Sequence, residues 1–175
     1  ASGKEWPRRV NKDILIQCGA ESLVGPESIA SSAGLIGVVD DSPAVLLQLD
    51  EMGKLLAVMQ NKMAGHTYNI TRELLKLYSS SSSLYIGDAY ADRKKIKRIV
   101  QPHAVVLGTS TPDTFWGNLS AENIGDGLIG RFLVFDAPGY VMPVEHEATD
   151  IAIPRDILER ARWWVDFNPS NGLGN

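Results

Sequence analysis

Hydrophobic positions along the chain follow two spacings, and each spacing predicts a different kind of element. Short aliphatic runs bounded by turn residues are typical of buried strands. They predict strands in "AVLLQL" (44–49), in "HAVVLGTSTP" (103–112), which runs into a polar Thr-Ser-Thr end, and in "RFLVF" (131–135). Apolar residues at helical spacing predict helices. These lie in "WPRRVNKDILIQCGAES" (6–22), "KLLAVMQNKMA" (54–64), "ITRELLKLYSS" (70–80) and "IPRDILERARWWVDF" (153–167).

The order of these elements predicts the fold class. Buried strands that alternate with helices indicate an α/β domain with a mainly parallel sheet and flanking helices. The Gly-, Ser- and Pro-rich stretch 25–43 is expected to be partly loop, with a short helix near 27–33. The stretch 79–102 lacks a long apolar face and predicts a hairpin or a strand-loop-strand insert. The length of 175 residues suits a single domain.

Composition narrows the class of protein. The chain is 44% apolar and 22% charged, which is ordinary for a soluble globular protein. No apolar run approaches the about 18 residues that a membrane helix needs, so no membrane partner is expected. The single cysteine and the lack of a secretory signal favour a cytoplasmic location. The net charge of −4 gives no overall attraction to nucleic acid, so any such contact needs a local basic patch.

The two ends of the chain predict that it is a piece of a longer protein. It begins with "ASGKEWPRR", without an initiator methionine, and ends with the polar, Gly- and Asn-rich "NPSNGLGN". We therefore expect any motif at its first residues to have its beginning outside this chain.

The first aliphatic strand ends in two adjacent carboxylates, Asp50 and Glu51. In open parallel sheets, ligands bind at the carboxyl ends of the strands. There Asp50 can hold a hydrated Mg²⁺ ion together with phosphate oxygens, and Glu51 can orient or deprotonate a water molecule. Nucleotide hydrolases use this arrangement, which is called Walker B. The structural alternative is a core strand that ends in two solvated acids.

The first residues of the chain resemble the end of a phosphate-binding loop, G-x-x-x-x-G-K-[ST]. In "ASGKE", Gly3 and Lys4 match the last glycine and the lysine of that motif, immediately before a predicted helix. Backbone amides there would cradle phosphates, and Lys4 would reach the terminal ones. Glu5 stands where the motif has the Ser or Thr that binds magnesium. A Gly-Lys pair also occurs by chance.

Two later segments carry further candidates for phosphate chemistry. The second predicted strand runs into Thr109 and Ser110, where a polar side chain can bind the terminal phosphate or the attacking water, as the residue called sensor 1 does. Arg131, between glycines and a predicted strand, can stabilise transition-state charge in its own site or in that of a neighbouring subunit. The alternatives are an ordinary loop before Pro112 and a surface salt bridge.

A basic segment stands out in this acidic chain. "DRKKIKR" contains Arg93, Lys94, Lys95, Lys97 and Arg98, which can neutralise nucleic-acid phosphates. Two tyrosines just upstream, at positions 85 and 90, are candidates for stacking on bases. The alternative is a solvated strand edge, where lysines prevent pairing with other strands.

Three segments together resemble the P-loop ATPase domain of phage- and plasmid-type primase–helicase proteins, a family related to replicative helicases. They are "SIASSAGLI", "LLQLDEMGKLL" and "VVLGTSTPDTFWGNLSAENIGDGLIGRFLVF", and the resemblance spans residues 1 to about 140. It implies one P-loop NTPase core of the RecA/helicase type, ATP hydrolysis with Mg²⁺, work on single-stranded DNA and a homo-oligomeric ring. The implied roles are phosphate binding by Lys4, magnesium binding by Asp50, water activation by Glu51, a sensor at Thr109 or Ser110, and an arginine finger at Arg131.

The leading functional hypothesis is therefore an ATP-hydrolysing motor domain of a DNA replication protein. A second hypothesis is a non-catalytic nucleotide- or DNA-binding module that retains the fold, which Glu5 favours. A nucleotide-dependent transferase or kinase is a third, although nothing in the chain suggests an acceptor site. The three histidines and Cys18 show no spacing typical of metal ligands.

Overall fold

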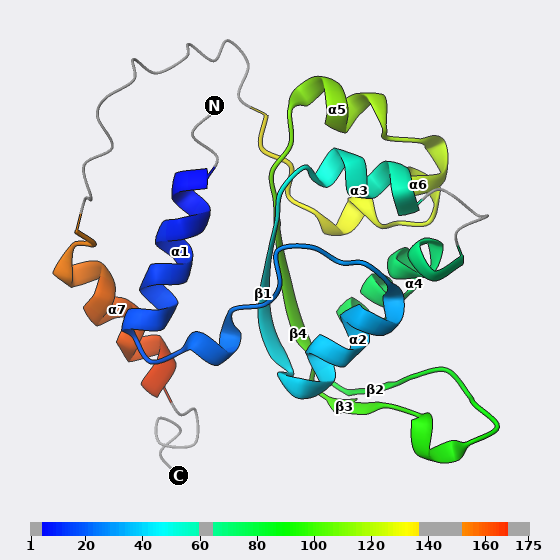
Figure 1. The fold of residues 1–175 in the computed structure, drawn as a ribbon, viewed down its shortest axis with the longest axis horizontal. Coiled ribbons are helices and arrows are strands. Elements are labelled where there is room, and N and C mark those ends of the chain that lie inside the picture. Colours follow the sequence, from blue (N-terminus) through cyan, green and yellow to red (C-terminus); the bar gives the residue numbers. More distant parts are fainter. Residues whose placement is uncertain (1–4, 60–64, 137–151, 168–175) are drawn as a thin grey trace. The chain divides into compact units, whose positions relative to one another are not determined.

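The computed structural model describes residues 5–59, 65–136 and 152–167 (Figure 1). Gly3 and Lys4 lie outside these residues, and so does the side chain of Arg93. The chain divides into two compact units, one within 1–24 and 137–175 and the other within 25–136. None of the described helices combines the length and the apolar character needed to cross a membrane.

The first unit contains two of the predicted helices. They are α1 (Glu5–Gln17) and α7 (Arg155–Asp166), with a short 3-10 helix, η1 (Glu21–Leu23), after α1. Pro7 lies within the first turn of α1, where its missing N–H costs no helical hydrogen bond. The side chain of Arg162 donates to the carbonyl of Gln17 at 3.2 Å, so the two helices contact each other at the end of α1. Both helix predictions are confirmed.

The second unit is built around a parallel pair of strands, β1 (Ala44–Leu49) and β4 (His103–Gly108). Their register pairs Ala44 with His103 and Leu49 with Gly108, so the two strands end side by side. This confirms both strands and an α/β fold with a small parallel sheet. The expectation that the second strand is buried is wrong, because Val105 and Leu107 of β4 are 59% and 37% exposed. Alternate residues of β1, including Leu47 and Leu49, are buried in the core.

Helices of the same unit pack against this pair of strands. They are α2 (Ser32–Asp41), α3 (Met52–Met59), α4 (Gly65–Ser79), α5 (Pro112–Gly117) and α6 (Ala121–Gly125), with the 3-10 helix η3 (Ile129–Arg131) after α6. The core gathers aliphatic side chains from three helices, among them Val39, Leu56 and Ile70, around Leu47 of β1. α3 and α5 follow the carboxyl ends of β1 and β4 directly, as Figure 1 shows. The predicted helices in 54–64 and 70–80 are therefore confirmed, the first of them as far as the described residues reach.

A separate antiparallel hairpin joins α4 to β4. Its strands are β2 (Leu84–Ile86) and β3 (Arg98–Val100), and a short 3-10 helix, η2 (Arg93–Lys95), lies in the loop between them. The insert predicted in 79–102 is thus a hairpin. It reaches β4 at that strand's amino end, away from α3 and α5 (Figure 1).

Two further predictions from the sequence are wrong. Residues 132–135 form no strand, and Leu133 and Phe135 are 87% and 89% exposed. Residues that favour strands do so mainly because they pack well against neighbouring strands. No described strand pairs with this segment, so its composition alone does not make it a strand. The short helix expected near 27–33 is also misplaced, because the helix in this stretch, α2, begins only at Ser32. Ser31 caps α2 by accepting a hydrogen bond from the amide of Gly34 at 3.0 Å.

Candidate functional site

The carboxyl ends of β1 and β4 bring two sequence-predicted residues into contact. Thr109 Oγ1 donates a hydrogen bond to Asp50 Oδ1 at 2.9 Å. The backbone continues the strand pairing beyond the strands themselves. The amide of Thr109 donates to the carbonyl of Leu49 at 3.0 Å, and the amide of Met52 donates to the carbonyl of Thr109 at 2.8 Å. We call Asp50, Glu51, Thr109 and Ser110 the strand-end cluster.

Ser110 belongs to the same cluster through the first turn of α3. Its hydroxyl accepts a hydrogen bond from the amide of Gly53 at 3.3 Å. Gly53 is buried, and a Cβ atom there would lie 2.6 Å from the carbonyl oxygen of Thr114 and 2.8 Å from Ser110 Oγ. Only glycine therefore allows α3 to approach the loop after β4 this closely. Sequence reasoning missed this residue, because the predicted helix begins at residue 54 and Gly53 is interpreted as a turn residue after the strand.

Glu51 stands at the turn between β1 and α3 in a conformation that is uncommon for its residue type. Its φ angle is +53°, in the left-handed region, and its amide donates to Asp50 Oδ1 at 2.9 Å. Its carboxylate forms an ion pair with Lys54, one helical turn further along. Both side chains of the pair are largely exposed, and exposed pairs contribute little to stability. The carboxylate of Glu51 is therefore free to exchange this partner for a ligand.

Glu5, the departure from the phosphate-loop motif, is the first described residue of α1. Its carboxylate accepts a hydrogen bond from Arg8 Nη2 at 2.6 Å. The Glu5 side chain is exposed, whereas Arg8 is buried. An acidic side chain in the first turn of a helix is favourable, because it complements the helix dipole. Its ionic partner is thus a neighbouring arginine in the same helix.

Arg131, at the end of η3, contacts residues outside the strand-end cluster. Its Nη1 donates to the carbonyl of Gly127 at 2.8 Å, and its guanidinium lies 5.1 Å from the ring centroid of Tyr78 at the end of α4. Neither contact involves the strand-end cluster. The structure therefore brings together Asp50, Glu51, Thr109 and Ser110, but it engages Arg131 elsewhere.

The basic residues of the hairpin differ in what they contact. Lys94, Lys95 and Arg98 are exposed. Lys97 instead reaches back to α2, where its Nζ donates to Asp40 Oδ2 at 2.6 Å. This hydrogen bond and the charge of Asp40 raise the pKa of Lys97. Lys97 therefore fastens the hairpin to α2.

The two candidate stacking tyrosines also have different environments. Tyr90 is 54% exposed, but Tyr85 is 2% exposed. The hydroxyl of Tyr85 donates to Glu73 Oε2 at 2.5 Å, and burial raises the pKa of Tyr85 above its usual value. The expectation that Tyr85 stacks on bases is wrong, because its ring is enclosed between the hairpin and α4.

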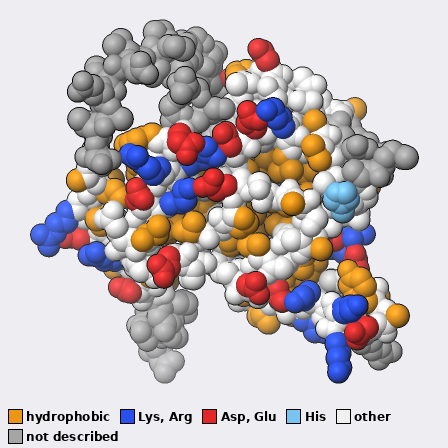
Figure 2. Space-filling model, in the orientation of Figure 1, with side chains coloured by type: hydrophobic (Ala, Val, Ile, Leu, Met, Phe, Trp, Pro, Cys, Tyr) orange, Lys and Arg blue, Asp and Glu red, His pale blue; other side chains and the backbone are white. Residues whose placement is uncertain are grey.

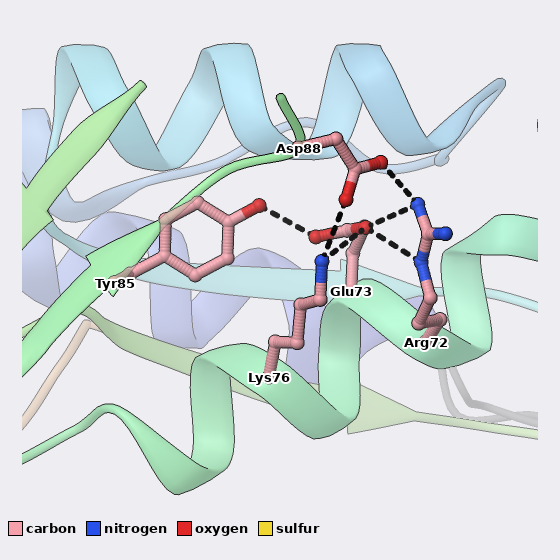
Figure 3. Close-up of polar contacts among 5 residues, drawn as sticks. All are labelled: Arg72, Glu73, Lys76, Tyr85 and Asp88. Carbon is pink, nitrogen blue, oxygen red and sulfur yellow. Dashed lines mark hydrogen bonds and ion pairs between the residues drawn. The ribbon is translucent and has the colours of Figure 1, made fainter. Parts of the chain in front are cut away.

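A polar network at the base of the hairpin surrounds the buried carboxylate of Glu73 (Figure 3). Arg72 Nε donates to Glu73 Oε1 at 3.1 Å, and Lys76 Nζ donates to Asp88 Oδ1 at 2.8 Å. The hydrogen bond from Lys76 is the main cause that lowers the pKa of Asp88. We call Arg72, Glu73, Lys76, Tyr85 and Asp88 the hairpin-base network.

Sequence reasoning missed this network, although one signal was present. Glu73 lies between Ile70 and Leu77 at helical spacing, which places a carboxylate on the buried face of α4. A buried carboxylate requires partners, and the pattern could have prompted a search for them. The partners could not be identified in advance, because one of them, Tyr85, belongs to the hairpin, and the sequence pattern around Glu73 does not show how the hairpin packs against α4.

Three comparisons, with family models, with curated proteins and with solved structures, gave no match to this chain. Within the described ranges, no group of three or more His, Cys, Asp or Glu side chains gathers to hold a metal ion. The strand-end cluster offers one carboxylate beside a hydroxyl, a donor set that suits Mg²⁺ only when phosphate oxygens and water complete its coordination.

Proposed function

We propose that this chain is a nucleotide-hydrolysing domain with a P-loop core, acting on ATP with Mg²⁺. One observation carries the proposal. A threonine hydroxyl and an aspartate carboxylate hydrogen-bond at the carboxyl ends of two adjacent parallel strands, with a second carboxylate next in sequence. This is the edge of an open α/β sheet at which ligands bind.

The residues of the strand-end cluster have separate roles in this proposal. Asp50 and the hydroxyl of Thr109 face the same space, and Asp50 would hold the metal, which would screen phosphate charge. Glu51 would accept a proton from the attacking water after leaving Lys54. Ser110 would bind the terminal phosphate. Gly3 and Lys4, outside the described residues, would supply the phosphate-binding backbone and a positive charge.

The wider proposal is the motor domain of a phage- or plasmid-type DNA replication protein that assembles as a ring. The sequence resemblance supports it, together with exposed basic residues on the hairpin. The guanidinium of Arg131 contacts Gly127 and Tyr78, so this proposal gives it no role in the chain's own site. In a ring of identical subunits, Arg131 would instead contribute to the site of a neighbouring subunit.

A second candidate is a nucleotide- or DNA-binding module without turnover. The pairing of Glu5 with Arg8 favours it, since the position that usually offers a hydroxyl to magnesium carries an acid engaged with arginine. The two candidates agree on binding and differ on hydrolysis.

Phosphate release from ATP, measured in the longest natural polypeptide that contains this chain, tests the proposal. Wild-type protein is expected to hydrolyse ATP only with Mg²⁺. Glu51→Gln should lower the rate at least a hundredfold, as expected for loss of a general base. Lys54→Gln, which removes only the ion-pair partner, is the control and should stay near the wild-type rate. Folded protein that binds ATP without hydrolysing it would favour the non-catalytic module.

A further inference from the structure

A groove runs along one face of α1. Its lining residues on this helix recur at intervals of three or four positions, so they share one side of the helix. They are Trp6, Val10, Asp13 and Gln17. Ile153, which leads into α7, also lines the groove. Both segments belong to the same compact unit, and we call this feature the α1 groove.

The α1 groove has the size and the lining of a site for one planar ring. Its volume is about 400 Å³, at the lower end of the range for small-molecule sites. Trp6 is 47% exposed, so its indole offers an aromatic face to a ligand. Val10 and Ile153, both half-buried, supply apolar contacts in the same lining. A flat ring can therefore stack on the indole while aliphatic groups contact its edges.

The polar side chains of the α1 groove decide which ring is suitable. Arg9 and Asp13 carry opposite charges, so the groove favours a neutral group over an anion or a cation. Figure 2 shows charged side chains of both signs among hydrophobic ones over α1 and α7. Asp13 can accept hydrogen bonds, and the amide of Gln17 can both accept and donate. Adenine matches this set, because it combines an amino group that donates with ring nitrogens that accept.

The sequence before the α1 groove connects it with phosphate binding. Lys4, the lysine that matches the phosphate-binding motif, precedes Trp6 by two positions in the chain. Trp6 and Val10 lie in the first two turns of α1, which together advance about 11 Å along the helix axis. A single ribose joins the base of a nucleotide to its phosphates, so the base must bind close to the phosphate site. A nucleotide held by its phosphates at the start of α1 can thus place its base in the groove.

We propose that the α1 groove binds the adenine base of the nucleotide. The ring stacks on the indole of Trp6, and its amino group donates a hydrogen bond to the carboxylate of Asp13. Val10 and Ile153 contact the remaining edge of the ring. This role rests on the proposed function, which assigns residues to the phosphates and the metal but none to the base. The groove would therefore set the preference of the protein for one base over another.

Isothermal titration calorimetry with the longest natural polypeptide that contains this chain tests the stacking on Trp6. The ligands are a non-hydrolysable ATP analogue and inorganic tripolyphosphate, which offers phosphates without a base, each with Mg²⁺. Trp6→Ala should weaken binding of the analogue about tenfold and leave tripolyphosphate binding unchanged, whereas Trp6→Phe should keep most of the affinity. Trp163→Ala on α7 removes a tryptophan that is 56% exposed and outside the groove, and this matched control should bind both ligands as the wild type does.

The corresponding analogue of inosine triphosphate tests the contact with Asp13. Inosine carries a carbonyl oxygen in place of the amino group of adenine, so Asp13 would face an acceptor instead of a donor. Wild-type protein should therefore prefer the ATP analogue about tenfold, because a mismatched polar group is left without a partner. Asp13→Asn, whose amide can donate to that oxygen, should lose most of this preference. Asp113→Asn on α5 removes the same charge and should keep it.

The outcomes separate the base site from the proposed function. Equal losses of both ligands in Trp6→Ala would overturn the base site, as would an unchanged affinity for the ATP analogue in that variant. An unchanged preference over the inosine analogue in Asp13→Asn would overturn the role of Asp13. Tripolyphosphate binding that persists in these cases would leave the proposed function standing. A wild-type protein that binds neither ligand would contradict the proposed function itself. Circular dichroism of each variant establishes that its fold is retained.

Discussion

The sheet β1–β4 and the hairpin β2–β3 are held in place by different interactions. Leu47 and Leu49 of β1 are buried among aliphatic side chains from surrounding helices. The hairpin buries only two side chains from its strands, Tyr85 and Ile99, and hydrogen bonds and ion pairs tie it to α4 and α2. Apolar burial contributes more free energy than exposed ion pairs do, so the core holds β1 in place, whereas polar contacts hold most of the hairpin.

This difference matters for the two proposed sites. The strand-end cluster lies at the end of β1, whose side chains are buried in the core, and this suits chemistry that requires fixed positions. The hairpin carries its exposed groups on a short antiparallel element outside the main core. Affinity for a ligand there can be changed with little effect on the core.

The largest expected effect is on the stability of the sheet. Leu47→Ala should lower the free energy of unfolding by about 2–5 kcal/mol, because the Leu47 side chain is fully buried and its removal leaves a cavity in the core. Urea denaturation followed by circular dichroism measures the change. Leu84→Ala, on the exposed face of the hairpin, is the matched control and should change stability by less than about 0.5 kcal/mol. Similar losses in the two variants would remove the contrast between the regions.

The hairpin-base network should show an intermediate effect. Tyr85→Phe removes the hydroxyl that donates to the buried Glu73 and should cost about 1–3 kcal/mol of stability. A double-mutant cycle with Glu73→Gln, measured by urea denaturation, isolates the interaction between the two side chains. A coupling energy near zero would mean that the tyrosine ring, rather than its hydroxyl, holds the hairpin.

The smallest expected effect concerns pH. Hydrogen bonding to Lys76 lowers the pKa of Asp88 below its usual 3.8, so the ionised form is favoured in the folded state. Its contribution to stability is complete above pH 3.8 and is lost as the pH falls through the lower folded value. Because Asp88 is partly exposed, this contribution should stay under about 1 kcal/mol. Stability measured between pH 5 and pH 2 should therefore fall less steeply in Asp88→Asn than in the wild type, and parallel curves would contradict this origin.

Local pattern was sufficient to predict both strands of the parallel pair and most helices. The aliphatic density of β1 reflects burial on both of its faces. The similar run in β4 predicted the strand but not its environment, because Val105 and Leu107 are 59% and 37% exposed. The contact between Asp50 and Thr109 followed from the rule that parallel strands end at the same edge. These features depend on short sequence segments and on general rules of topology.

Features that depend on distant partners could not be predicted in this way. Tyr85 appeared available for stacking, but its burial depends on Glu73 of α4. Lys97 resembled its basic neighbours, but Asp40 of α2 engages it. The segment 132–135 has the composition of a strand, and it lacks a described neighbour to pair with. In each case the outcome depends on whether a residue far away in the sequence makes a contact, and the neighbouring residues do not show this.

The affinity of Mg²⁺·ATP for the protein, with and without Asp50→Asn, tests the central claim most directly. A titration with a fluorescent ATP analogue at increasing Mg²⁺ concentrations measures binding without requiring hydrolysis. If the strand-end cluster holds the metal–nucleotide complex, wild-type affinity will rise with Mg²⁺, and Asp50→Asn will lose that rise while keeping its metal-free affinity. Asp113→Asn, an exposed carboxylate in the first turn of α5, should behave as the wild type does. The same Mg²⁺ dependence in Asp50→Asn as in the wild type would contradict the account.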